Sequence, residues 1–115
     1  MSERSPRLYL DDLLEAGRAI QSYIGETSFN EFTSDRMRQS AVIREFEIIG
    51  EAVGKLPDTL KEQVPAVAWQ DIKDFRNLLV HQYFGVDLAI VWEVIHNDLP
   101  VLLDQVELLR QQVSP

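Results

Sequence analysis

The stretch AVIREFEIIGEAVGKLP, residues 41–57, decides the fold that this sequence predicts. Apolar residues recur in and just before it every three or four positions, and they form two neighbouring rows on a helix. One row comprises Val42, Phe46, Ile49, Val53 and Leu56, and the other comprises Met37, Ala41, Ile48 and Ala52. A stripe of this width is typical of a helix at the centre of a bundle. We therefore predict a central helix from about Asp35 to Lys55, which Pro57 ends.

Before this helix, the sequence predicts one further helix and a loop. Ser5 is a good N-cap, and Pro6 suits the first helical position, where a missing N–H group costs nothing. Apolar residues then recur at three- and four-residue intervals until Gly25, a common kind of helix stop. Residues 25–35 are polar and rich in capping residues, so we expect them to form a loop in which Thr33, Ser34 or Asp35 caps the next helix.

After the central helix, residues 58–64 suit a short helical turn, and a third helix is expected from Ala66 or Trp69 to Tyr83. Gly85 then breaks the chain. Asp87 is the expected N-cap of a last helix, whose apolar spacing continues almost to the C-terminus. Pro100 lies inside this helix and predicts a kink, because a proline removes one backbone hydrogen bond and clashes with the preceding turn.

No segment alternates between apolar and polar residues as a β-strand does, so the predicted fold class is all-α. The chain of 115 residues is long enough for one core and leaves no room for a second domain. We expect a single domain, residues 1–115, with four main helices in an up-down bundle, a short extra helix and a kinked last helix.

The charge of the chain limits its partners. It has 19 acidic and 11 basic residues, a formal charge of −8, which repels polyphosphates at long range. Any contact with nucleic acid then requires a local basic pocket or a second chain. There is no apolar run long enough for a membrane helix, no secretory signal and no cysteine. We expect a cytoplasmic protein without membrane contact, and nothing in the sequence calls for a cofactor or a metal.

Residues 74–85, DFRNLLVHQYFG, bring four chemically versatile side chains together: Arg76, Asn77, His81 and Tyr83. A guanidinium binds phosphate in bidentate fashion, an imidazole exchanges a proton near neutral pH, an amide orients it and a phenol stacks or hydrogen-bonds. These are the parts of a metal-independent phosphodiester cleaver. The spacing by itself equally fits an ordinary helix end, in which the arginine snorkels and the histidine is exposed.

The helical wheel raises a difficulty for a shared site. Arg76 and His81 diverge by roughly 140° on an ideal helix, too far to serve one phosphate easily. Two arrangements resolve this. Either the helix loosens before Gly85 and swings His81 round, or two copies of the chain face each other and pool two arginines and two histidines in one cleft.

Two other clusters have simpler explanations. Glu93 and His96 have the Glu-x-x-His spacing of dimetal bundles, but that site needs a second copy of the motif, which is absent. Glu45, Glu47 and Glu51 could form a catalytic or Mg²⁺-binding carboxylate pair. They also fit the polar side of a core helix, with Arg44 pairing to Glu47 or Glu51.

The segment RNLLVHQY resembles the Arg-x4-6-His signature of the HEPN superfamily, and its R-x4-H-x-Y form is similar to the HepT-like toxin ribonucleases. The resemblance continues in AVIREFEIIGEAVGKLP, WQDIKDFRN and FGVDLAIVWEVIHNDLPVLLDQV, so it covers nearly the whole chain. It implies a HEPN-like bundle that forms a homodimer or a higher assembly around an RNA-binding cleft. It also implies that Arg76 and His81 are the catalytic pair and that Asn77 supports them.

The same resemblance implies a role for Tyr83 as the tyrosine that a nucleotidyltransferase (MNT-type) antitoxin modifies with AMP. The expected function is the toxin of a type II toxin–antitoxin system, an endoribonuclease that cleaves RNA by attack of the 2′-OH without metal. The alternative is a non-catalytic HEPN-like helical dimer that binds a nucleotide or a protein, which the acidity of the chain favours. A helical dimerisation protein is a third reading.

Overall fold

The computed structural model describes residues 4–81 and 85–113, and of His81 the backbone alone. Its helices are α1 (Pro6–Ile24), α2 (Phe29–Thr33), α3 (Arg36–Lys55), α4 (Asp58–Lys61), α5 (Trp69–His81), α6 (Leu88–Glu93), the π-helical η1 (Val94–Asp98) and α7 (Leu99–Gln112). The described residues contain no strand. The predicted all-α class is therefore confirmed.

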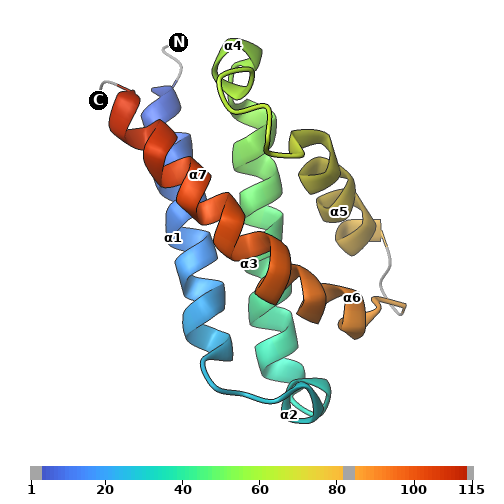
Figure 1. Cartoon of the computed structure of the whole chain (residues 1–115). Coiled ribbons are helices and arrows are strands. Elements are labelled where there is room, and N and C mark those ends of the chain that lie inside the picture. The colour runs from blue at the N-terminus through green and yellow to red at the C-terminus, as the bar shows by residue number, and fades with distance from the viewer. Residues whose placement is uncertain (1–3, 82–84, 114–115) are drawn as a thin grey trace.

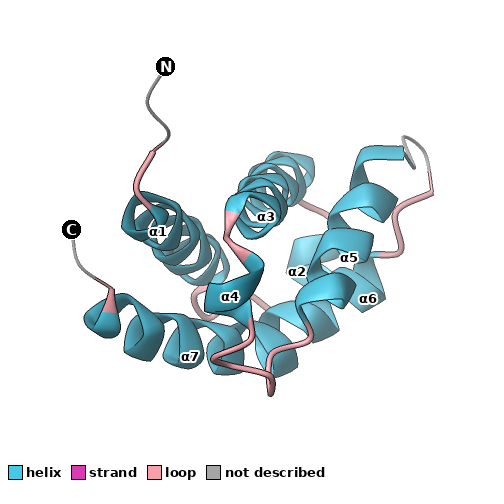
Figure 2. Ribbon diagram, turned by 90° about the horizontal axis from the view of Figure 1, so that it is seen from above, coloured by secondary structure: helices cyan, strands magenta, loops and turns pink. Residues whose placement is uncertain are grey.

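The main helices run up and down in turn around the central α3. Figure 1 shows α1 beside α3, α5 on the opposite side of α3, and α7 crossing in front of α1 and α3. Seen from above in Figure 2, α1, α3 and α5 form a row, and α7 runs across beneath it. The start of α1 and the end of α7 lie together, where Arg7 Nη1 donates to the carbonyl of Val113 at 3.0 Å. The predicted bundle with a central second main helix is confirmed.

The helix ends follow the predicted capping residues. Ser5 accepts a hydrogen bond from the backbone N–H of Arg7, and Pro6 occupies the first helical position. Gly25 ends α1 with φ of 48°, in the left-handed region where a residue with a Cβ is strained. Asp35 caps α3 by accepting from the N–H of Arg38. These helix ends could be predicted from the sequence because each capping residue satisfies a backbone group at a helix terminus.

The segment between α1 and α3 departs from the predicted loop, since it contains the five-residue helix α2. Its N-terminus is a capping box: Glu31 N–H donates to Ser28 Oγ at 3.1 Å, and Ser28 N–H donates to Glu31 Oε1 at 3.0 Å. Accepting the Ser28 backbone N–H lowers the pKa of the Glu31 carboxyl. Phe32 anchors α2 in the core, with its ring 5.5 Å from that of Trp92.

The last helix is kinked, as Pro100 predicted, and a π-turn accompanies the proline. The backbone N–H of Leu99 donates to the carbonyl of Val94, five residues earlier, at the end of η1. The widened turn thus falls directly before the residue that has no N–H with which to continue the helical hydrogen bonds. The segment predicted as one kinked helix is therefore α6, η1 and α7 in succession.

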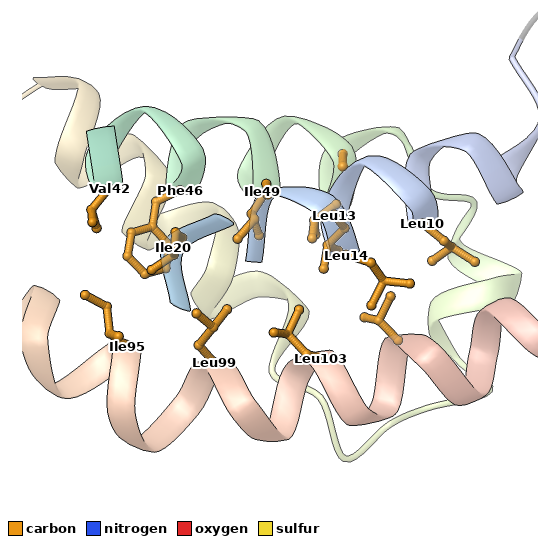
Figure 3. Packing of buried hydrophobic residues seen from close by; sticks show 14 of the residues in the cluster. Leu10, Leu13, Leu14, Ile20, Val42, Phe46, Ile49, Ile95, Leu99 and Leu103 are labelled. Carbon is orange, nitrogen blue, oxygen red and sulfur yellow. The ribbon is translucent and has the colours of Figure 1, made fainter. Parts of the chain in front are cut away.

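The core lies where α1, α3 and the last helix meet. Figure 3 shows Leu13 and Ile20 of α1 and Ile49 of α3 opposite Leu99 and Leu103 of the last helix. One apolar row of α3 is buried as predicted: Val42, Phe46, Ile49, Val53 and Leu56. In the other row, the prediction was wrong for Met37, which lies on the first turn of α3 and is 83% exposed. Within the described ranges, no helix is long and apolar enough to span a membrane.

Candidate active site

Helix α5 carries Arg76, Asn77 and His81, and contacts at its first turn and with α3 position it. The indole Nε1 of Trp69 donates to the carbonyls of Lys61 (3.1 Å) and Val64 (3.2 Å), which ties the first turn of α5 to the preceding connection. Further along, the ring of Phe75 packs edge-on against Phe46 of α3, with 5.2 Å between ring centroids. Leu79 is buried beside the same core. These contacts set the face of α5 that meets α3.

Arg76 follows Phe75 and lies directly against the backbone of α3. A Cβ on Gly50 would lie 2.4 Å from both Cβ and Cγ of Arg76, closer than carbon atoms can approach. The arginine side chain therefore occupies the space that any other residue at position 50 would fill. The wheel placed Arg76 on or beside the buried face of the helix, and the structure confirms this, since its side chain is only 33% exposed.

The guanidinium of Arg76 has a different surrounding at each nitrogen. Nη1 donates to Oδ1 of Asn77 at 3.2 Å, and Nη2 lies 3.8 Å from Oε1 of Glu51 on α3. Nε is buried, and none of the described atoms accepts a hydrogen bond from it. The structure therefore places the amide oxygen of Asn77 on the guanidinium of Arg76.

Of His81 and Tyr83, the structure describes only the backbone of His81. His81 is the last residue of α5, its side chain lies outside the described part of the chain, and Tyr83 lies outside the described residues altogether. The backbone is α-helical from Arg76 through His81, so the helix does not loosen between them. This opposes the first of the two arrangements, which required such loosening to swing His81 toward Arg76. The assignment of His81 and Tyr83 stays a prediction.

The two alternative sites of the sequence analysis, one at Glu93 and His96 and one at Glu45, Glu47 and Glu51, contain residues that make other contacts. His96 is exposed on the π-turn, and its Nδ1 is 2.9 Å from the carbonyl of Trp92. The two rings pack at a tilt of 42°, with 4.3 Å between their centroids. Over the side chains that the structure describes, no three His, Cys, Asp or Glu residues gather as a metal site would require. Glu45 accepts a hydrogen bond from the hydroxyl of Tyr23 at 2.8 Å, which raises the pKa of that phenol.

Glu51 is the residue whose partner the sequence did not reveal. We expected Arg44 to pair with Glu47 or Glu51 along α3, but among the described ion pairs Glu51 faces Arg76 instead, and Arg44 has none. The pair joins two helices, so spacing within α3 could not predict it. The available signal was Gly50, a residue without a side chain inside the buried stripe, which marks a close approach of another element.

The fold and this sequence motif define a class of protein: a small helical bundle whose third main helix ends at the histidine of an Arg-x4-His-x-Tyr sequence. The profile of the family described as "Ribonuclease HepT-like" matches residues 13–109. The chain therefore belongs to the HepT-like ribonuclease family.

Named relatives match the chain over nearly its full length. It is 38% identical over 109 residues to "Probable ribonuclease HepT" of Thermococcus cleftensis, a match that covers 95% of this chain and 99% of the relative. It is 35% identical over 109 residues to a protein of Methanocaldococcus jannaschii named as a candidate RNase, covering 95% of this chain and all of the relative. No solved structure matches the chain significantly.

Proposed function

We propose that this chain is an endoribonuclease that cleaves RNA without a metal ion and acts as the toxin of a type II toxin–antitoxin system. One observation carries the proposal. In a chain of the HepT-like family, Arg76 of the R-x4-H-x-Y motif is held against α3 with its terminal nitrogens at the surface. An arginine in this position suits the binding of a phosphodiester. A cytoplasmic location is part of the proposal, because the RNA substrate is there.

The proposed reaction needs only an acid, a base and a cation. The ribose 2′-OH loses its proton to one imidazole and attacks the adjacent phosphorus, forming the P–O2′ bond. The P–O5′ bond breaks, and a second imidazole protonates the departing oxygen, which leaves a 2′,3′-cyclic phosphate and a 5′-OH. His81 of one chain and His81 of its partner copy take these two roles, since an imidazole changes protonation near neutral pH. Arg76 binds the non-bridging oxygens and stabilises their charge, which for one preorganised donor contributes on the order of 10²–10³ in rate.

A homodimer belongs to this proposal because one helix cannot supply the whole site. Arg76 and His81 both lie on the continuous helix α5, and residues five apart diverge by roughly 140°. Two α5 helices that face each other across a two-fold axis bring the arginine of one chain toward the histidine of the other. The pooled arginines also supply the local positive charge that a chain with a net charge of −8 needs to hold RNA.

Inhibition by an antitoxin is the remaining part of the proposal. A nucleotidyltransferase partner would transfer AMP to the hydroxyl of Tyr83, forming a phosphodiester on the phenol and releasing pyrophosphate from ATP. The added anion and its bulk would compete with the RNA phosphate for Arg76. We expect a nucleotidyltransferase gene beside the gene of this chain, and co-expression of the two, followed by intact mass, is expected to show AMP additions that disappear in Tyr83→Phe.

Growth inhibition tests the assignment of the catalytic pair. Arg76→Ala and His81→Ala are each expected to relieve the toxicity of the expressed chain while its helicity stays intact. The chain offers matched controls, because Arg44 is an exposed arginine on α3 without a described ion pair, and His96 is an exposed histidine on the π-turn. Arg44→Ala and His96→Ala are expected to remain toxic. Toxicity that survives the loss of His81 contradicts the proposal.

The rival function is a non-catalytic helical dimer that binds a nucleotide or a protein, and the net charge of −8 favours it. RNA affinity measured against salt concentration separates the two. If arginines contact several phosphates, the RNA affinity falls steeply as the salt concentration rises. For single-stranded RNA, each contacted phosphate lowers the slope of log affinity against log salt concentration by roughly 0.7. An absence of RNA binding at low salt favours the rival.

A further inference from the structure

Glu51 of α3 is the feature from which a further inference follows. Its side chain is 69% exposed, and its Oε1 lies 3.8 Å from Nη2 of Arg76. This distance is longer than a hydrogen bond, so Glu51 acts on the guanidinium chiefly through its charge. The second partner of the guanidinium, Asn77, accepts from Nη1 at 3.2 Å. An acidic and an amide oxygen thus flank the two terminal nitrogens.

The N–H donors of Arg76 outnumber the partners that it has in the structure. A guanidinium has five N–H donors, one on Nε and two on each terminal nitrogen. The Nε donor is buried and cannot reach a ligand in solvent. Asn77 takes one N–H of Nη1, and Glu51 lies beyond hydrogen-bond distance of Nη2, so at least one N–H on each terminal nitrogen is left for an incoming anion. Two such donors are the number that a bidentate contact with phosphate requires.

Gly50 fixes the other end of the arginine side chain. Cβ and Cγ of Arg76 occupy the position where a side chain on residue 50 would begin, 2.4 Å from an ideal Cβ. The stem of Arg76 therefore rests on the backbone of α3, one residue before the carboxylate that faces its tip. Consecutive positions of α3 thus hold the stem and orient the head of one arginine.

We propose that Glu51 is a positioning residue for Arg76, with Gly50 providing the surface on which the arginine rests. The inference rests on the proposed function, because Glu51 affects the reaction only if Arg76 binds the RNA phosphate. Orientation of a donor before the reaction lowers the barrier, and a misplacement of about 1 Å can cost roughly 10²-fold. Since Glu51 is mostly exposed and its contact is long, we expect about a tenfold loss when its charge is removed.

Single-turnover cleavage of RNA by Glu51→Gln tests the proposal, with Glu47→Gln as the matched control. Glu47 lies one turn earlier on α3 and has no described ion pair, so the two variants remove the same charge from the same helix. We expect the rate at saturating RNA to fall about tenfold in Glu51→Gln and to stay unchanged in Glu47→Gln. RNA affinity is expected to be equal in the two variants, because each removes one negative charge and so reduces the repulsion between protein and RNA by the same amount.

A double-mutant cycle tests whether Glu51 acts through Arg76. In an Arg76→Lys background, the compact ammonium cannot make the same two-point contact, so Glu51→Gln is expected to cause little further loss. Equal rates for Glu51→Gln and Glu47→Gln overturn the proposal, and so does a full tenfold loss in the Arg76→Lys background. RNA binding that tightens in Glu51→Gln alone also overturns it, because Glu51 would then compete with the phosphate.

The controls separate this inference from the proposed function. If Arg76→Ala cleaves RNA as the original chain does, the proposed site is wrong. If Arg76→Ala is inactive and Glu51→Gln is fully active, the inference alone fails. A readout without activity completes the test: the Arg76 Nε–H signal in ¹H–¹⁵N NMR, identified by its loss in Arg76→Lys. It is expected to shift in Glu51→Gln and not in Glu47→Gln, and an unmoved signal contradicts the proposal.

Discussion

Replacement of Gly50 by alanine places a methyl group where the side chain of Arg76 lies. The methyl carbon would be 2.4 Å from Cβ and Cγ of Arg76, and the Cβ atom cannot move unless the backbone of α5 moves. Overpacking of this kind costs about 1–3 kcal/mol. The same change removes a glycine from a helix interior, which stabilises by roughly 0.8–1 kcal/mol. We therefore expect Gly50→Ala to lower the free energy of unfolding by about 0–2 kcal/mol.

Gly54→Ala is the matched control for this prediction. Gly54 lies one turn later on the same helix, and a Cβ there has no neighbour within 4 Å. This variant keeps the gain in helix propensity without the clash, so it should be stabilised by up to about 1 kcal/mol. The difference between the two variants isolates the steric cost, about 1–3 kcal/mol.

Thermal unfolding followed by circular dichroism at one protein concentration measures this difference. For a domain of about this size, 1 kcal/mol corresponds to roughly 4 °C in Tm, so Gly50→Ala should melt about 4–12 °C below Gly54→Ala. Gly50→Ala should also lose RNA cleavage, because α5 is displaced from α3. Equal melting temperatures for the two variants would refute the close approach of Arg76 to α3.

Two further predictions concern the ends of the bundle and its core. The pKa of Glu31 is lowered in the folded chain by the Ser28 backbone N–H, so its stabilisation is present above the unfolded pKa and is lost as pH falls through the folded pKa. Tm measured from pH 7 to 3 should therefore fall less steeply in Glu31→Gln, and identical slopes would contradict the capping box. Leu99→Ala, at a buried position, should lower the free energy of unfolding measured in urea by about 2–5 kcal/mol. Leu108, on the same helix, is 55% exposed, and Leu108→Ala should change that free energy by about 0.5 kcal/mol or less.

The helices of this protein were predictable where local chemistry decides them. Ser5, Gly25, Asp35 and Asp87 each act on a backbone group within three or four residues, and all four occupy the predicted caps. Helix α2 was missed although Ser28 and Glu31 have the spacing of a capping box, because five residues are too few to show helical periodicity. The π-turn before Pro100 was not predicted either, since a proline indicates a kink without specifying which hydrogen bonds change.

The candidate site was predictable in its residue types but not in its contacts. The wheel placed Arg76 beside the buried face, because the direction of a side chain on one helix follows from spacing. The pairing of Arg76 with Glu51 depends on how α5 crosses α3, and that crossing is set by Phe46, Phe75 and Gly50 together. Tertiary packing of this kind is not encoded in the periodicity of either helix.

The most direct test of the proposed cleavage mechanism is the chemical identity of the ends of the cleaved RNA. The purified chain is incubated with RNA in EDTA, and the 3′ ends of the products are identified for the original chain and for Arg76→Ala, His81→Ala and His96→Ala. We predict 2′,3′-cyclic phosphate ends from the original chain and from His96→Ala, and no cleavage by the other two variants. Cleavage that stops in EDTA, or that persists without His81, would contradict this mechanism.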